Sequence, residues 1–166
     1  MRTRSLILGL AAAVAALSAC ACASDTVAPS VKTSLETYVV ALSGAAERPT
    51  PRVSTASGVA VLQVIDANTL SFAVTATGLT GTIAGHFHLG DNNSAGGVMY
   101  GFYSNSAGTD FLGTQVAAGI ITRAGGGFSG VFTFDSLLVR ARAGTAYVNL
   151  HTKTYPGGEL RGQLTR

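Results

Sequence analysis

Apolar and polar residues alternate with a period of two from Thr37 onward, in short segments rich in Val, Thr, Phe and Tyr. A strand places successive side chains on opposite faces, so this period predicts half-buried strands rather than helices. The clearest case runs over residues 70–77, where Leu, Phe, Val and Ala alternate with Ser, Ala and Thr. The turn-forming residues 66–69 precede it. We therefore expect a hairpin with the segment before them.

Further segments of the same character follow, separated by Gly, Asn, Asp or Ser. Many short strands at this spacing are typical of a β-sandwich or a barrel. The sequence thus predicts an all-β fold, an antiparallel Greek-key-like sandwich or barrel. The predicted strands cover residues 38–42, 59–65, 70–77, 83–89, 98–103, 116–121, 131–134, 146–152 and 159–164.

One segment, Asp135–Gly144, has a helical pattern instead. Asp135 is a residue type that caps helices, Leu138 and Ala141 share one face, arginines come late and a glycine ends the segment. These features predict one short helix near residues 136–143. The nearby run Gly125–Gly127 lacks the Lys-Ser/Thr of a phosphate-binding loop, and we expect a hairpin turn there.

The first residues resemble a bacterial export signal. Arg2 and Arg4 precede an apolar stretch that ends in Leu17-Ser18-Ala19-Cys20, which is similar to a lipobox. We therefore expect residues 1–19 to be a lipoprotein signal peptide and Cys20 to carry the lipid that anchors the protein to a membrane. The alternative is ordinary cleavage after Ala23, which would release a soluble chain.

The predicted lipid anchor implies an exported protein of the cell envelope. Ala21, rather than Asp, follows the lipidated cysteine and resembles the outer-membrane sorting pattern, provided that the host has an outer membrane. Residues 20–36 are small, polar and without a steady apolar period, so we expect them to be a tether. The globular domain is then expected over residues 37–166.

Composition limits the partners of this domain. Both cysteines of the chain, at positions 20 and 22, precede the domain, so no disulfide stabilises it. Eleven Lys and Arg face eight Asp and Glu, and loss of Arg2 and Arg4 with the leader leaves nine against eight. Such a balance excludes the strongly basic surface of a nucleic-acid-binding protein.

The three histidines are the residues that point most clearly to chemistry. His86 and His88 are two positions apart in a predicted strand, so they share one face while Phe87 occupies the other. His151 lies on the polar face of a later strand. If the strands are neighbours, the three imidazoles form a nitrogen-only metal site, for which ligand softness favours Cu(II) or Zn(II). The alternative is surface or hydrogen-bonded histidines without a metal.

Other side chains fill supporting roles in this prediction. Asp91, Asn149 and Glu159 are candidates to orient an imidazole through its second nitrogen. Met99 is expected in the core rather than on the metal. The domain has no cysteine and no Gly-x-Ser-x-Gly motif, so we expect no enzyme based on a nucleophile of those types. Copper is the favoured ion and zinc the second choice.

Several of these motifs together resemble the CHRD domain, named after chordin, an extracellular antagonist of bone morphogenetic proteins. The similarity implies an extracellular β-rich module and matches the family's His-x-His and later His-Thr to His86, His88 and His151. The stretch after His88 departs from the family's Gly-Pro-rich pattern. The motifs run from Leu42-Ser43-Gly44-Ala45-Ala46-Glu47-Arg48-Pro49 through Gly78-Leu79-Thr80-Gly81 to Tyr155-Pro156-Gly157-Gly158-Glu159-Leu160-Arg161-Gly162-Gln163-Leu164.

A second, local resemblance concerns Gly85-His86-Phe87-His88-Leu89-Gly90, which is similar to the copper strand of Cu/Zn superoxide dismutases. The chain lacks the bridging histidine, the remaining zinc ligands and the disulfide of those enzymes. The resemblance therefore implies a copper site without dismutase activity.

Two functions are compatible with these observations. The first is a membrane-anchored module that binds copper through the three histidines. The alternative is a non-catalytic cell-surface module that binds a protein or glycan through strand edges and a long loop over residues 90–113. The aromatic anchors of that loop would be Tyr100, Phe102, Tyr103 and Phe111, whose other interpretation is packing inside the barrel.

Overall fold

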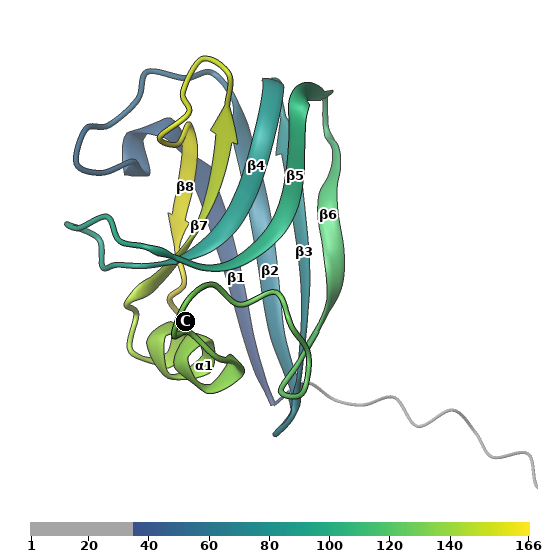
Figure 1. Cartoon of the computed structure of the whole chain (residues 1–166). Helices are drawn as coiled ribbons and strands as arrows, with labels where there is room; N and C mark the ends of the chain where they lie inside the picture. Colours follow the sequence, from purple (N-terminus) through teal and green to yellow (C-terminus); the bar gives the residue numbers. More distant parts are fainter. Residues whose placement is uncertain (1–34) are drawn as a thin grey trace, which may run out of the picture. The chain divides into compact units, whose positions relative to one another are not determined.

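A computed structural model describes residues 35–166 of the chain. Eight antiparallel strands form one sheet in the order β5-β4-β7-β8-β1-β2-β3-β6, and the sheet curls into a nearly closed barrel (Figure 1). The predicted all-β architecture with one short helix is therefore confirmed. The strands are β1 Glu36–Ser43, β2 Ser57–Asp66, β3 Thr69–Thr77, β4 Leu79–Leu89, β5 Val98–Phe111, β6 Thr114–Thr122, β7 Ala146–Thr152 and β8 Leu160–Gln163.

Period-two alternation decides which face of each strand is buried. Tyr38, Val40 and Leu42 of β1 point inward, and β3 buries Leu70 and Val74 while its threonines face out. The predicted hairpin between β2 and β3 is present, with a bulge between Val64 and Asp66. The interior is one continuous apolar cluster that includes residues of β1 to β7 and of the helix.

Two glycines turn the chain across the seam of the barrel. The edge strands β5 and β6 border this seam, and β3 leads to β4 across it through Gly78 alone. Gly78 has φ +68° and Gly113, between β5 and β6, has φ +89°, a region that side chains with a Cβ rarely adopt. The Gly113 N–H donates to the carbonyl of Ala76 at 2.9 Å, which holds the two corners together.

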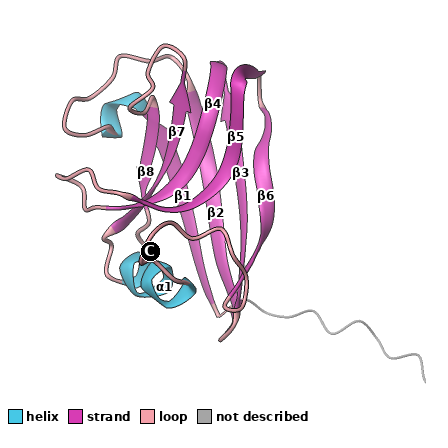
Figure 2. Ribbon diagram, in the orientation of Figure 1, coloured by secondary structure: helices cyan, strands magenta, loops and turns pink. Residues whose placement is uncertain are grey.

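Helix α1, Phe134–Arg142, covers one end of the barrel (Figure 2). It begins two residues earlier than the predicted range of 136–143. Its cap is Thr133 rather than Asp135, because the Thr133 hydroxyl accepts from the Ser136 N–H and the Ser136 hydroxyl accepts from the Thr133 N–H. Gly144 follows the helix with φ +66°, as expected for its C-terminal glycine.

Three local predictions are wrong. Residues 131–133 form no strand, because they lead into the capping box of α1. The Gly125–Gly127 run belongs to the long connection between β6 and α1 and does not join two strands. The predicted loop over residues 90–113 is a loop only up to residue 97, since β5 occupies Val98–Phe111. The predicted strand over residues 98–103 is the first part of β5, and four register shifts against β4 break the alternation of the strand that continues from it.

A second helix-like element, η1, is a single 3₁₀ turn over Gly44–Ala46. It opens the long connection from β1 to β2 and lies against β8. The connections that follow β4, β7 and η1 run over the outer face of strands β4, β7 and β8 in Figure 1. This half of the outer face is where the histidines lie.

Candidate metal centre

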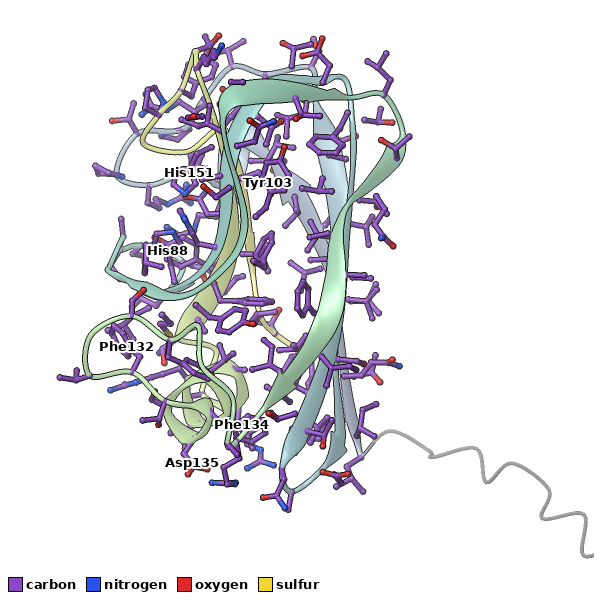
Figure 3. All side chains as sticks on the ribbon, turned by 45° about the vertical axis from the view of Figure 1, so that its right-hand side comes forward. His88, Tyr103, Phe132, Phe134, Asp135 and His151 are labelled. Atoms are coloured by element: carbon purple, nitrogen blue, oxygen red, sulfur yellow. The ribbon has the colours of Figure 1, made fainter. Side chains whose placement is uncertain are left out.

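The three histidines share the outer face of two neighbouring strands. β4 and β7 pair with His86 opposite Asn149, His88 opposite Tyr147 and Ala84 opposite His151. Phe87, between the first two, points inward and is 1% exposed. Figure 3 places His88 and His151 on the side of the ribbon away from the barrel interior. The predicted common face for the three imidazoles is therefore present.

The imidazoles converge closely enough for one ion. One nitrogen from each ring lies within 4.8 Å of those of the other two. His86 Nδ1 and His151 Nε2 are 3.0 Å apart and share a hydrogen bond. Three nitrogens that each lie about 2.0 Å from one ion are about 3.4 Å from each other. His86 and His151 are already this close, whereas the ligand atoms of the cluster are up to 4.8 Å apart, so His88 needs to move inward by roughly 1 Å.

Main-chain carbonyls orient two of the rings. His88 Nδ1 donates to the Gly96 carbonyl and His151 Nδ1 donates to the Pro156 carbonyl, each at 3.0 Å. A carbonyl only accepts, so both protons are on Nδ1 and both Nε2 lone pairs face the cluster. The His151 lone pair then accepts from His86 Nδ1–H. A carbonyl partner of this kind is typical of imidazoles that bind metals.

One lone pair of the cluster has no protein partner. His88 is 7% exposed, and its Nε2 atom is buried without a hydrogen bond. An unsatisfied buried acceptor costs free energy, so a native structure that keeps one calls for an explanation. A metal ion at the centre of the three rings supplies the missing partner, and the donor set fits it.

The cluster is electrostatically suited to neutral imidazoles. Burial, together with the charges of the other two rings, lowers the pKa of His86 from 6.5 to about 4. Burial also lowers the pKa of His88 to about 4, against the opposing hydrogen bond to Gly96. The pKa of His151 is lowered by burial as well. Near neutral pH all three rings therefore keep the unprotonated form that binds metals.

A stack of three side chains supports His88 from the β7 side. Tyr147 lies parallel to the His88 ring, with centroids 5.0 Å apart and planes 10° apart. The Arg161 guanidinium covers the opposite face of Tyr147 at 3.6 Å from the ring centroid. Arg161 also donates to the carbonyls of Asp91 and Ser94, within the loop that carries Gly96. Arg161 therefore holds both supports of His88, the tyrosine ring and the loop.

The sequence did not reveal this stack. Tyr147 was visible as part of the polar face of β7, but its partner Arg161 lies in another strand and is 1% exposed. An arginine next to a glycine in a four-residue strand carries no signal of burial by itself. The only hint was its position in the C-terminal motif of the family.

The three residues expected to orient the imidazoles bond elsewhere. The Asp91 carboxylate accepts from the Asn93 N–H and the Ser94 hydroxyl within its own loop. Asn149 donates to the Glu47 carboxylate and to the Leu160 carbonyl. Glu159 accepts from Ser54 and Thr152. In place of these side chains, main-chain carbonyls orient His88 and His151.

The four aromatic residues proposed as binding anchors pack inside the barrel. Phe111 is buried, and the other three, Tyr100, Phe102 and Tyr103, pack against the apolar core. Phe102 lies 5.5 Å from Phe72 and 5.2 Å from Phe87 between ring centroids. Met99 is fully buried in the same core, as expected. The four aromatic residues are therefore not available as anchors for the alternative, surface-binding function. The burial of Met99 takes no expected ligand from the metal site.

The N-terminal predictions lie outside the described residues. These are the signal peptide over residues 1–19, the lipid on Cys20 and most of the tether over residues 20–36. β1 begins at Glu36, one residue before the expected start of the domain. Within residues 35–166, no helix has the length and apolar character needed to cross a bilayer.

Comparison with known proteins agrees with the motifs. The family model described as the CHRD domain matches residues 38–164, which is most of the chain and contains all three histidines. Neither the curated proteins nor the solved structures gave a match. The chain belongs to the CHRD domain family.

Proposed function

We propose that this protein binds a single copper ion through His86, His88 and His151, with zinc as the second choice. The observation that carries the proposal is the buried lone pair of His88 Nε2, which faces two other imidazoles and has no partner among the described residues. Two of the rings are already fixed in the tautomer that a metal needs. Binding requires the His86 proton to leave Nδ1, which breaks the hydrogen bond to His151, and His88 to move inward by roughly 1 Å.

The donor set supports copper over the other common ions. Three nitrogens with no thiolate and no carboxylate suit copper or zinc and do not suit magnesium or calcium, which prefer oxygen. For divalent ions at a site of this kind, affinity is higher for copper than for zinc. Copper is therefore the ion that the site selects when both are present.

We further propose that the protein works in the cell envelope. The leader and the lipobox-like Cys20 support export and a lipid anchor in a membrane, the outer membrane if the host has one. A domain without cysteines offers no thiol to copper or to oxidants. We propose a binding role without catalysis.

A titration with copper tests the proposal. The protein, purified without a polyhistidine tag, should bind one equivalent of copper and lose that binding in the triple variant H86A/H88A/H151A. H86A alone, which alters the least buried ring, should also weaken binding by about 100-fold or more. Thr75→Ala, on β3 of the same barrel, is the matched control and should bind as the wild type does. Unchanged copper binding in the triple variant would refute the proposal.

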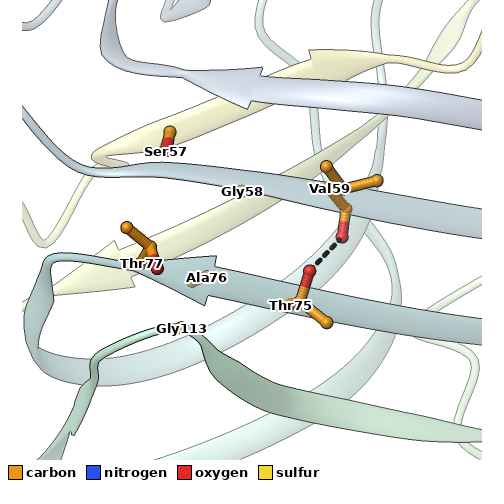
Figure 4. Close-up of a pocket in the computed structure, with 7 residues that line it drawn as sticks. All are labelled: Ser57, Gly58, Val59, Thr75, Ala76, Thr77 and Gly113. Carbon is orange, nitrogen blue, oxygen red and sulfur yellow. Dashed lines mark hydrogen bonds between the residues drawn. The ribbon is translucent and has the colours of Figure 1, made fainter.

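A second candidate function, binding of a glycan or protein at the surface, has one supporting observation. The outer face of β1, β2, β3 and β6 carries no charge and is not covered by loops; Val39, for example, is 67% exposed. A hollow of about 330 Å³ opens on it, lined by Ser57, Val59, Thr75 and Thr77 with Gly58, Ala76 and Gly113 (Figure 4). Hydroxyl groups and small apolar side chains suit an uncharged glycan.

Co-sedimentation with purified peptidoglycan in the presence of a chelator tests this candidate. Retention of the wild type, lost in the variant V59E/T75E, would support a glycan site on this face. Equal sedimentation of the two proteins would count against it.

A further inference from the structure

We propose that the centre binds copper as Cu(I) in preference to Cu(II). This inference rests on the copper site proposed above and adds the oxidation state that the site selects. Three properties of the cluster carry it, namely its lack of negative charge, its burial and its number of ligands.

No negatively charged side chain is among the described residues that could bind an ion at this position. The described residues offer only the three imidazoles to it. The buried carboxylate Glu47 is occupied by Asn149, and the carboxylate of Glu159 by Ser54 and Thr152. The guanidinium of Arg161, behind Tyr147, also acts on His88, and its charge is positive. A divalent ion would therefore have only neutral ligands from the protein.

Burial makes that second charge costly. His88 and His151 are 7% and 8% exposed, and the loop around Gly96 and the turn at Pro156 cover them. The cost of taking an ion out of water grows with the square of its charge, so it is about four times larger for a divalent than for a monovalent ion of similar size. Neutral ligands in a dry site therefore favour the monovalent ion.

The number of ligands acts in the same direction. Cu(I) is satisfied by two or three donors, whereas Cu(II) and Zn(II) take four or more. The protein supplies three nitrogens, and a backbone carbonyl is already bonded to the second nitrogen of two of the rings. Only the His86 side is open enough to admit a further ligand from solvent.

Ligand softness alone had favoured the divalent ions. Thiolates and thioethers are the ligands that select Cu(I) by softness, and the methionine of β5, Met99, lies in the barrel core. The preference for Cu(I) thus arises from charge and coordination number, not from sulfur.

The affinities of the two oxidation states give the first test. The protein without a polyhistidine tag is titrated with Cu(I) under anaerobic conditions against a Cu(I) chelator, and separately with Cu(II) against a Cu(II) chelator. We expect the Kd for Cu(I) to be lower than that for Cu(II) by about 100-fold or more. The reduction potential of the bound copper should accordingly lie above that of the aqueous ion.

A matched pair of variants separates charge from structure. Gly101 on β5 lies opposite His86, and a Cβ there would meet the His86 ring at an ordinary contact distance of 3.6 Å. Gly101→Asp places a carboxylate beside the site, and Gly101→Asn places a neutral side chain of the same shape. We expect the aspartate to reduce the preference for Cu(I) about tenfold or more and the asparagine to change it less than about threefold.

The outcomes distinguish the two proposals. Absence of copper binding, or binding that persists in H86A/H88A/H151A, refutes the copper site itself. Binding that needs the histidines, but with Cu(II) held as tightly as Cu(I) or more tightly, refutes only the preference. Equal behaviour of the aspartate and asparagine variants refutes its electrostatic cause.

Discussion

The main chain sets which nitrogen is free in two of the three imidazoles. Gly96 and Pro156 accept the Nδ1 protons of His88 and His151, which leaves Nε2 of both rings available on the same side. Glycine at position 96 permits this contact, because a Cβ there would lie 2.2 Å from the carbonyl of Leu89. The loop that follows β4 is thus shaped for the close approach that fixes His88.

Tyr147 should contribute to metal affinity through its ring. Tyr147→Leu removes the surface stacked on His88 and should weaken copper binding about tenfold. Tyr147→Phe keeps the ring and should lose much less. Competition titrations of the two variants measure the difference. Equal losses would show that the stack does not position His88.

Protons should destabilise the metal-free protein in mild acid. The pKa values of His86 and His88 are about 4 in the folded protein, against 6.5 as the ordinary value. As pH falls from 6.5 toward 4, the unfolded chain therefore takes up protons before the folded one does. The stability that the neutral rings contribute is present above pH 6.5 and is lost through this window, by on the order of 1 kcal/mol per pH unit.

Urea unfolding at a series of pH values measures this effect. The triple variant H86A/H88A/H151A should show a flatter dependence between pH 6.5 and 4, since it lacks the groups that titrate. A wild-type slope no steeper than that of the variant would contradict the assignment of neutral buried rings.

At the scale of single residues, the metal ligands could be predicted from the sequence, but the groups that surround them could not. The positions of His86, His88 and His151 on outer faces follow from the two-residue period of β4 and β7, which local sequence reveals. Their burial does not follow, because it depends on loops held by Arg161 from a distant strand. The expected helpers Asp91, Asn149 and Glu159 have polar partners closer than the rings.

Among the elements, a regular strand was predictable over its whole length, whereas the most irregular one was predictable only in part. β3 keeps its alternation over its whole length, so its pattern predicted its face correctly. β5 shifts register four times against β4, and each shift moves the following side chains to the other face. A pattern with period two cannot follow such a strand to its end, which explains why only residues 98–103 of β5 were predicted as a strand.

The junction of β8 with β1 should tolerate no side chain at position 162. A Cβ on Gly162 would lie 2.4 Å from Val40 Cγ1 and 2.5 Å from the Ala41 carbonyl, and the backbone there cannot yield cheaply. Gly162→Ala should therefore destabilise the protein by about 2 kcal/mol or more. Chemical denaturation measures this value.

Gly126→Ala is the matched control for this prediction. A Cβ there would meet nothing within 4 Å. The change should alter the free energy of unfolding by less than about 0.5 kcal/mol. Similar stabilities of the two alanine variants would show that β8 does not pack against β1 as described.

Over the whole domain, the sheet divides the outer surface into two parts with different roles. Strands β4, β7 and β8 lie beneath loops and hold most of the buried polar side chains, including His88 and His151, next to the part-exposed His86. Strands β1, β2, β3 and β6 have a bare, uncharged outer face. The all-β class was predictable from the spacing of strands, whereas this division was not, because it depends on which loops fold back over the sheet.

The most direct test of the proposed site asks whether one copper ion binds among the three imidazoles of this barrel. Anomalous diffraction at the copper absorption edge, from crystals of the copper-loaded protein, locates the ion directly. We predict one strong peak about 2.0 Å from a nitrogen of each of His86, His88 and His151. A copper peak at any other place, or none from protein that has been offered stoichiometric copper, would contradict the account.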